Sequence, residues 1–213
     1  MRRRRKVARA YDMALEISRE LSRQAAVLDV GCGNGFIAHH LTGLLDATVV
    51  GLDVGTETNA KINYLPYDGR HFPIQDQSFD AVLLCYVLHH AQDPALILNE
   101  VARVLRHGGL AIVYEDIPSL WWDRAVCWVH NQQWRQRTGP CAFQLEHDWR
   151  QILANARFEV LKERSLSRWR NLAHPVLRRF YVVRLNDLNP FARSAHNPGA
   201  LTVGIHTEVS LST

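Results

Sequence analysis

The residues best suited to chemistry lie in the stretch VLDVGCGNGFIAHHL, at positions 27–41. Gly31, Gly33 and Gly35 stand at alternate positions between an apolar run, which indicates a buried strand, and a pattern that indicates a helix. Such glycines let the backbone approach a ligand closely. Asp29 would repel a pyrophosphate at the helix N-terminus but would attract a cation. The stretch therefore favours a cationic ligand, whereas an NAD-dependent oxidoreductase, which normally carries G-x-G-x-x-G, is the alternative for the glycines alone.

Two further acidic residues follow the next apolar runs. Asp53 comes 22 residues after Gly31, where a carboxylate can hydrogen-bond both hydroxyls of a ribose. NAD-binding enzymes place an acid there too, so Asp53 does not discriminate between the ligands. Asp68, in YDGRHFP, can accept a hydrogen bond from an adenine amine, with Tyr67 or Phe72 against the ring. The alternative interpretation makes Asp68 a turn residue before Gly69.

The elements that would position these residues alternate between strands and helices. Apolar runs predict strands at 26–30, 48–53, 62–67, 79–87 and 110–116, and helical patterns stand at 7–23, 36–45, 94–106 and 147–156. Continuous apolar strands separated by helices favour a parallel sheet covered on both faces. Two more strands are predicted at 158–166 and 178–185. The chain thus divides into a basic tail and N-terminal lid helix (1–25), one α/β domain (26–188) and a loosely held tail (189–213).

Composition narrows the class of protein. At 213 residues, with 47% apolar and 22% charged residues, the chain fits one soluble globular domain. It has no 18-residue apolar window and no secretory signal, and its four cysteines form no CxxC pair, so we expect a cytoplasmic protein with reduced thiols. The five consecutive basic residues at 2–6 could meet nucleic acid, anionic lipid or an anionic small molecule, but a solvated, disordered tail is expected.

Four segments together carry a resemblance to a known family: VLDVGCGNG, VGLDV, YDGRHFPIQDQSFDAVLLCYVLHHAQDP and LNEVARVLRHGGLAIVYED. In order and spacing, residues 26–116 resemble the class I S-adenosylmethionine-dependent methyltransferases, and most of all the small-molecule group with an LHH-x-x-DP stretch. The chain departs from the family at His107, where proline commonly precedes the two glycines. The resemblance implies a Rossmann-like, seven-stranded, mostly parallel sheet with helices on both faces and the last strand antiparallel.

The same resemblance implies S-adenosyl-L-methionine as cofactor and assigns its contacts. The glycine loop and Asp29 would hold the methionine end, Asp53 the ribose, and residues 67–69 the adenine. Residues at the end of the strand 79–87 would flank the sulfonium, and the N-terminal helix would fold over the cofactor. The cofactor-binding residues implied are Tyr11, Asp29, Gly31, Cys32, Gly33, Gly35, Asp53, Val54, Tyr67, Asp68, Gly69, Cys85 and Tyr86.

Methyl transfer is an in-line displacement, and a hydroxyl or ammonium acceptor needs a base to remove its proton. His89 and His90 follow the fourth predicted strand and are catalytic candidates, although the pair can equally belong to a packing motif. His147 and Glu115 are further candidates. The sequence LCYVLHH lacks the Pro-Pro-aromatic motif of amino-methylating nucleic-acid enzymes, which makes a nucleic-acid partner unexpected. No tight His/Asp ligand cluster is visible, so no metal is predicted.

All six tryptophans lie beyond residue 120, and the segment 117–146 is expected to cap the substrate. Trp121, Trp122 and Trp128 are the predicted substrate contacts. Three interpretations overlap: a helix that packs on the sheet, a wall of a pocket for an apolar or aromatic acceptor, and weak contact with a membrane surface.

The function expected from these features is methyl transfer to a small, hydrophobic or aromatic metabolite. The alternatives are an RNA- or protein-directed methyltransferase guided by the arginines, and a non-catalytic module that binds the cofactor. The oligomeric state is left open.

Overall fold

The computed structural model describes residues 2–171 and 174–186, and its centre is one seven-stranded sheet. The strand order is β3-β2-β1-β4-β5-β7-β6, in which β7 runs antiparallel to both β5 and β6 and the other neighbours are parallel. This arrangement confirms the predicted fold class. The strands are β1 (Ala26–Val30), β2 (Thr48–Asp53), β3 (Asn63–Pro66), β4 (Phe79–Cys85), β5 (Leu105–Ile117), β6 (Phe158–Leu166) and β7 (Leu177–Leu185).

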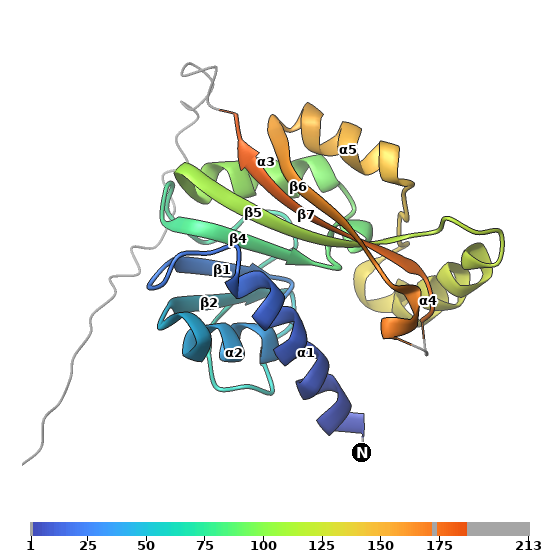
Figure 1. Cartoon of the computed structure of the whole chain (residues 1–213), viewed down its shortest axis with the longest axis horizontal. Helices are drawn as coiled ribbons and strands as arrows, with labels where there is room; N and C mark the ends of the chain where they lie inside the picture. The colour runs from blue at the N-terminus through green and yellow to red at the C-terminus, as the bar shows by residue number, and fades with distance from the viewer. Residues whose placement is uncertain (1, 172–173, 187–213) are drawn as a thin grey trace, which may run out of the picture.

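Helices cover both faces of the sheet, as Figure 1 shows. One face carries α1 (Arg2–Ser18) and α2 (Phe36–Leu45), and the other carries α3 (Pro94–Val104) and α5 (Glu146–Asn155). The helix α4 (Asp123–Thr138) lies beyond the ends of the long strands β5, β6 and β7 (Figure 1). Two short 3₁₀ turns, η1 (Leu88–His90) and η2 (Arg168–Arg170), complete the described elements. None of the described helices has the length and apolarity needed to cross a bilayer.

The sheet separates two apolar cores, which explains why its central strands are apolar on both sides. Val27 and Leu83 belong to the core beneath α1 and α2, whereas Leu28 and Leu84, their neighbours along the chain, belong to the core beneath α3 and α5. All four side chains are fully buried. Both cores pack against β1 and β4, so the loops that follow the carboxyl ends of these strands are attached to closely packed, rigid elements.

The N-terminal prediction was wrong in one respect. The basic segment at 2–6 was expected to be a disordered tail, but α1 begins at Arg2 and ends at Ser18. Arginine and lysine have high helix propensity, and an amphipathic helix anchored by Ala14 and Ile17 can extend through them at little cost. The tail predicted at 189–213 lies outside the described residues.

The segment after α3 also differs from the expected turn. His107-Gly108-Gly109 was predicted to end the helix, yet β5 already begins at Leu105 and includes these residues. A shift in the register of β4 and β5 between Phe79 and Ala81 accommodates the extra residues, and Gly108 has a φ of 75°. The strand therefore contains a bulge where the sequence pattern indicated a break.

The helix α3 begins at a side-chain cap that also explains the DP pair of the sequence. The Oδ1 atom of Asp93 accepts hydrogen bonds from the amides of Ala95 (2.9 Å) and Leu96 (3.2 Å), and Pro94 occupies the first helical position. Proline costs nothing there because the first amides of a helix have no intrahelical acceptor. The Asp93 cap thus fixes the residue at which α3 begins after η1.

We expect Asp93→Ala to destabilise the folded protein by about 1 kcal/mol, because two helix amides lose their acceptor. Urea denaturation gives the free energy of unfolding. Asp93→Asn is the matched control, since asparagine caps helices about as well as aspartate and should stay within a few tenths of the wild-type value. Equal losses in both variants would contradict the capping role.

Candidate functional site

The glycine loop lies at the carboxyl end of β1 and is held tightly to its neighbours. Gly31, Gly33 and Gly35 have φ angles of 65°, 54° and 72°, a region that suits glycine. A Cβ atom on Gly31 would lie 2.5 Å from Val87, and one on Gly35 would lie 2.9 Å from Ile62. A Cβ on Gly33 would meet no atom of the described residues within 4 Å. The outer glycines thus allow close packing, and the middle one has open space beside it.

Asp29 is the most unusual group beside this loop. Its side chain is buried, and neither carboxylate oxygen has a hydrogen-bond partner among the described residues. Desolvation, together with repulsion from Asp53, raises the pKa of Asp29 to about 7. The nearby Ala38 amide, which makes no hydrogen bond of ordinary geometry to the carboxylate, offsets this rise only in part. A buried carboxylate without a partner is costly unless a cation binds it. This site therefore fits a ligand with a positive charge, such as the ammonium and sulfonium of S-adenosylmethionine, better than a pyrophosphate.

Asp53 joins the end of β2 to the loop. Its Oδ2 atom accepts a hydrogen bond from the Gly33 amide at 2.7 Å, and its Oδ1 atom accepts one from the Gly55 amide at 3.2 Å. Desolvation, followed by the charges of Asp29 and Asp53, raises the pKa of the Cys32 thiol far above the ordinary value. The structure thus brings Asp29, Cys32, Asp53 and the glycines together, as the resemblance implied.

The segment assigned to adenine forms a tight turn next to Asp53. The Oδ1 atom of Asp68 accepts hydrogen bonds from the amides of Arg70 and His71, both at 2.7 Å, and the His71 bond contributes most to lowering its pKa. The turn interpretation is therefore confirmed, and a contact with adenine stays a prediction. A Cβ on Gly69 would lie 3.3 Å from half-exposed Val54, and Tyr67 packs edge-on against Phe72.

The end of β4 carries backbone strain that no sequence pattern indicated. Tyr86 has a φ of 63°, which is uncommon for a bulky residue and concentrates at functional sites. Its ring lies 6.0 Å from the Tyr114 ring and 5.9 Å from the Arg178 guanidinium. Desolvation, then the charges of Asp29 and Glu115, hold the pKa of the Cys85 thiol well above its usual range. This is the position at which the resemblance places the sulfonium.

His89 is fully buried directly behind this strand end. Its Nδ1 atom donates to Glu115 Oε2 at 2.5 Å, and Glu115 Oε1 accepts from the Leu88 amide at 2.8 Å. Phe143 stacks on the His89 ring with centroids 4.6 Å apart. Desolvation opposes the charge of His89, but the Glu115 carboxylate raises its pKa above the ordinary value. Its Nε2 atom has no hydrogen-bond partner among the described residues.

His90 faces α4. Its Nε2 atom lies 3.2 Å from Nε2 of His130, and its Nδ1 atom lies 3.1 Å from the Thr138 hydroxyl and 3.2 Å from the Cys141 sulfur. Desolvation, followed by the nearby His89, lowers the pKa of His90 to about 3, and the same two causes lower the pKa of His130 to about 4. Sequence reasoning missed His130, because its place on α4 fixes no distance to a histidine 40 positions earlier.

The other catalytic candidates lie in different surroundings. His147 lies in the first turn of α5 with 74% of its side chain exposed, and its Nε2 atom lies 3.0 Å from Asp148 Oδ1. It does not join His89, His90 and His130. Glu115 is fully buried and reaches only His89 and the Leu88 amide in the hydrogen bonds described above. His90 is therefore the candidate that lies between the sheet edge and the cap.

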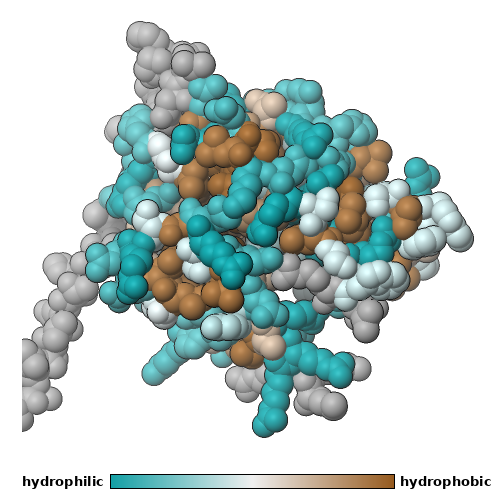
Figure 2. Space-filling model, in the orientation of Figure 1, coloured by the Kyte–Doolittle hydropathy of each residue, from teal (hydrophilic) through white to brown (hydrophobic). Residues whose placement is uncertain are grey.

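The three predicted substrate tryptophans lie mostly on the surface. Trp121 is 82% exposed, Trp128 is 63% exposed and Trp122 is 42% exposed, with the Arg168 guanidinium 5.8 Å from the Trp122 ring. The face in Figure 2 shows residues of intermediate hydropathy over α4, with apolar and polar ones beside them. A cavity of about 320 Å³ lies within the cap segment itself and has other walls: Pro118, Arg124, Cys127, Cys141, Phe143 and Leu145.

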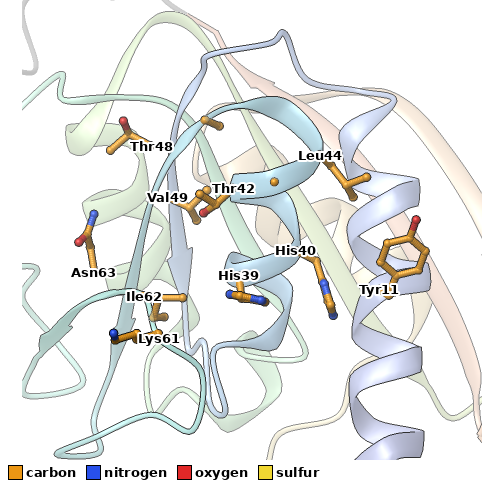
Figure 3. A pocket seen from close by; sticks show the side chains of 12 residues that line it. Tyr11, His39, His40, Thr42, Leu44, Thr48, Val49, Lys61, Ile62 and Asn63 are labelled. Atoms are coloured by element: carbon orange, nitrogen blue, oxygen red, sulfur yellow. The ribbon is translucent and has the colours of Figure 1, made fainter.

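A wider cavity, about 810 Å³, lies along α2 between α1 and β3. Figure 3 shows His40 of α2 directed toward Tyr11 of α1, and their rings meet edge-on at 5.3 Å. Lys61 and Asn63 line the same cavity from the β3 side. Tyr11 thus contacts the flank of α2, and its predicted contact with the cofactor stays a prediction.

With this geometry in view, residues 28–113 match the family model described as "Methyltransferase domain". These residues, about two fifths of the chain, resemble that domain. The match spans the glycine loop, Asp53 and the histidine pair, and with the class I structures below it identifies the cofactor of this domain type as S-adenosylmethionine.

Curated relatives share this region. The chain is 34% identical over 126 residues to a fatty-acid O-methyltransferase of Mycolicibacterium smegmatis, covering 52% of this chain and 45% of that protein. It is 32% identical over 96 residues to the 27-O-demethylrifamycin SV methyltransferase of Amycolatopsis mediterranei, covering 39% of this chain and 35% of that protein. The chain therefore spans less than half the length of these relatives, and the similarity reaches the methyltransferase domain but not the whole proteins.

Solved structures agree on the fold. The [4+2]-cyclase SpnF superposes with a TM-score of 0.66 at 19% identity, covering 83% of this chain and 80% of that one. A SAM-dependent methyltransferase of Methanosarcina mazei superposes with a TM-score of 0.62 at 20% identity, covering 79% and 96%. The likeness in fold therefore extends beyond residues 28–113 to most of the chain.

We expect Asp29→Asn to remove part of the pH dependence of stability. The pKa of Asp29 is about 7 when folded and 3.8 when unfolded, so the folded protein binds more protons between these values and loses stability as pH rises. This loss is roughly 2–3 kcal/mol between pH 5 and 8, and asparagine cannot contribute to it.

Urea denaturation of the ligand-free protein at pH 5 and pH 8 measures this difference. The control is Asp12→Asn, which changes an exposed side chain on α1 and should retain the wild-type pH dependence. If Asp29→Asn and the wild type lost stability equally with rising pH, Asp29 would not be an unpaired buried acid.

Proposed function

We propose that the chain binds S-adenosylmethionine at the carboxyl edge of β1, β2 and β4 and transfers its methyl group to a small hydrophobic or aromatic acceptor. The observation that carries this proposal is Asp29, a buried carboxylate without a partner beside an open glycine loop. When bound, the cofactor supplies a methyl group made electrophilic by its sulfonium. The residues of this chain bind the cofactor, orient the acceptor and accept the proton.

Asp29 supports binding of the methionine end, since an ammonium would relieve the cost of its buried charge. Gly33 leaves space beside the loop for the ligand to approach the backbone. Asp53 is partly exposed, and its two oxygens retain lone pairs for ribose hydroxyls after accepting from Gly33 and Gly55. Tyr67 and the Asp68 turn form the adjoining wall for adenine.

The cavity of about 320 Å³ within the cap segment is the proposed acceptor site. Its size suits a small molecule, and its wall is largely apolar through Cys127, Phe143 and Leu145. Two of its wall residues contact the histidine pair: Phe143 stacks on His89, and Cys141 lies 3.2 Å from His90. This cavity, rather than the exposed tryptophans, supports a hydrophobic or aromatic acceptor.

His90 is the proposed activating residue, because it lies between the strand end and this cavity. Its low pKa leaves the ring neutral at physiological pH. Its Nε2 atom faces His130 and its Nδ1 atom faces Thr138 and Cys141, so an acceptor hydroxyl would have to replace one of these contacts. His89 is less accessible, because Phe143 covers its ring and Glu115 occupies its Nδ1 atom. We propose that His89 and Glu115 position the η1 turn on which His90 stands.

A non-catalytic or differently catalytic role is the second candidate, and one observation favours it. A cyclase has the same fold at a TM-score of 0.66, so this fold does not by itself require methyl transfer. The two candidates share cofactor binding and differ in turnover. Formation of S-adenosylhomocysteine with a panel of aromatic and fatty acceptors separates them, because only methyl transfer produces it.

We expect Asp53→Ala to weaken S-adenosylmethionine binding roughly ten- to hundredfold, since charged hydrogen bonds to the ribose contribute about 1.5–3 kcal/mol. Calorimetry measures the dissociation constant. Asp53→Asn keeps an acceptor for the Gly33 amide and should fall between the alanine variant and the wild type. Glu159→Ala, on the exposed side of β6, is the control that should not change affinity. Unaltered affinity in Asp53→Ala would contradict the ribose assignment.

We expect His90→Gln to lower kcat about 100-fold while the cofactor dissociation constant stays the same, because general base catalysis contributes only to turnover. The measurement is the rate of S-adenosylhomocysteine formation with the best acceptor of the panel. His107→Gln, an exposed histidine at the start of β5, is the matched control. Small and equal effects on turnover and affinity would return His90 to a packing role.

A further inference from the structure

Three histidines from two distant segments converge between the sheet edge and the cap. His89 and His90 belong to η1, and His130 lies in the middle of α4. One ring nitrogen of each lies within 4.8 Å of the other two. The Nε2 atoms of His90 and His130 are 3.2 Å apart. Two imidazoles that bind one tetrahedral Zn²⁺ at 2.0–2.1 Å would have nitrogens about 3.3 Å apart, so this pair already has the required spacing.

Two of these rings have an outer partner on Nδ1, which leaves Nε2 to face the centre of the cluster. Nδ1 of His89 must donate to Glu115, because an ionised carboxylate only accepts. Nδ1 of His90 lies 3.1 Å from the Thr138 hydroxyl. Metal-binding histidines usually donate their other ring N–H to a carboxylate, carbonyl or hydroxyl in this way. The Glu115–His89 contact therefore has the form of a carboxylate–histidine–metal arrangement.

The buried Nε2 atom of His89 is an independent sign that a ligand belongs here. The side chain is 0% exposed, and this atom has no hydrogen-bond partner among residues 2–171 and 174–186. With or without a proton, such an atom leaves a polar group unsatisfied in the protein interior. Buried polar groups are nearly always satisfied, and a cation bound by the three Nε2 atoms would satisfy this one.

We infer that His89, His90 and His130 bind a single divalent transition-metal ion of the Zn²⁺ class. Three imidazole nitrogens suit zinc, cobalt or nickel, whereas magnesium and calcium prefer oxygen ligands. A site with three protein ligands leaves a fourth position open to water or to a hydroxyl of an acceptor. The ion joins η1 to α4, and the spacing of up to 4.8 Å closes by about 1.5 Å when it binds. It therefore also fixes the cap against the sheet.

This site depends on the histidines alone and not on the proposed methyl transfer. If a hydroxyl of the acceptor bound the ion, its pKa would fall, and it would lose its proton without a general base. His90 would then act as a ligand of the ion and not as the base. Ion binding can be measured without cofactor or acceptor. The proposed metal site can therefore be disproved while methyl transfer is observed, and methyl transfer can be disproved while the ion binds.

The test is titration of the chelator-treated, tag-free full chain with Zn²⁺ by calorimetry and with Co²⁺ by visible absorption. We expect one ion per chain, the intense visible bands of tetrahedral Co²⁺, and a higher Tm with Zn²⁺. His130→Ala should weaken binding by more than about 100-fold, because losing a ligand costs more than losing an outer partner. His107→Ala is the matched control and should bind as the wild type does.

Glu115→Gln provides a second variant that keeps the size of the buried side chain. Its single acceptor oxygen can serve either the Leu88 amide or His89 Nδ1, but not both. We expect it to weaken Zn²⁺ binding roughly 10- to 100-fold, as loss of a carboxylate partner does at other sites. No stoichiometric binding, equal affinity in His130→Ala, or Co²⁺ spectra that show thiolate ligation would each overturn the proposed site.

Discussion

Parallel pairing of β1 with β2 and β4 is the constraint on which the site depends. It places the carboxyl ends of the three strands at one edge, since parallel strands end on the same side of a sheet. Asp29 stands next to the last residue of β1, Asp53 ends β2 and Cys85 ends β4. Asp29 and Cys85, more than 50 positions apart in the sequence, thereby lie close together at one edge of the sheet. The two apolar cores hold these strands in place, so Asp29, Asp53 and Cys85 are already close to one another in the folded protein.

The position of Asp29 shows what this edge costs the protein without a ligand. Both faces of the sheet are covered, so a carboxylate within β1 is necessarily desolvated. Its pKa of about 7 means that the ligand-free protein holds it at the boundary between the neutral and charged forms. Burial of apolar side chains in the neighbouring strands offsets the unfavourable contribution of Asp29 to folding. Asp29 is thereby kept in a position suited to binding a cation. A functional site is where such local conflict is expected.

The sequence predicted the fold well where local pattern and tertiary environment agree. The bounds of 26–30, 48–53 and 158–166 match β1, β2 and β6, and 36–45 matches α2. β1, β2 and α2 are apolar segments with a polar or glycine boundary, so the hydrophobic pattern determines their ends, whereas β6 has polar residues along much of its length. The glycine loop and Asp53 were predictable for the same reason, because their roles follow from positions next to those strands.

Prediction failed where a contact between distant segments decides the structure. The approach of His130 to His90 depends on the path of 117–146, and no periodicity encodes that path. The φ of Tyr86 is equally hidden, since tyrosine has no local preference for it. The start of α1 was missed because a run of like charges suggests disorder, although the helix behind it can extend through them.

The attachment of the cap to the sheet also follows a different principle from the core. Buried Asp123 of α4 pairs with Arg168 of η2 at 2.9 Å. Such pairs have strict geometry and contribute little net stability, so they fix the orientation of the cap more than they hold it closed. The histidine cluster is a further contact of this directional kind between α4 and the sheet edge. Because only a few polar contacts orient the cap, residues that line its cavity can be substituted without changing the carboxyl ends of β1, β2 and β4. The same sheet can therefore carry caps suited to different methyl acceptors.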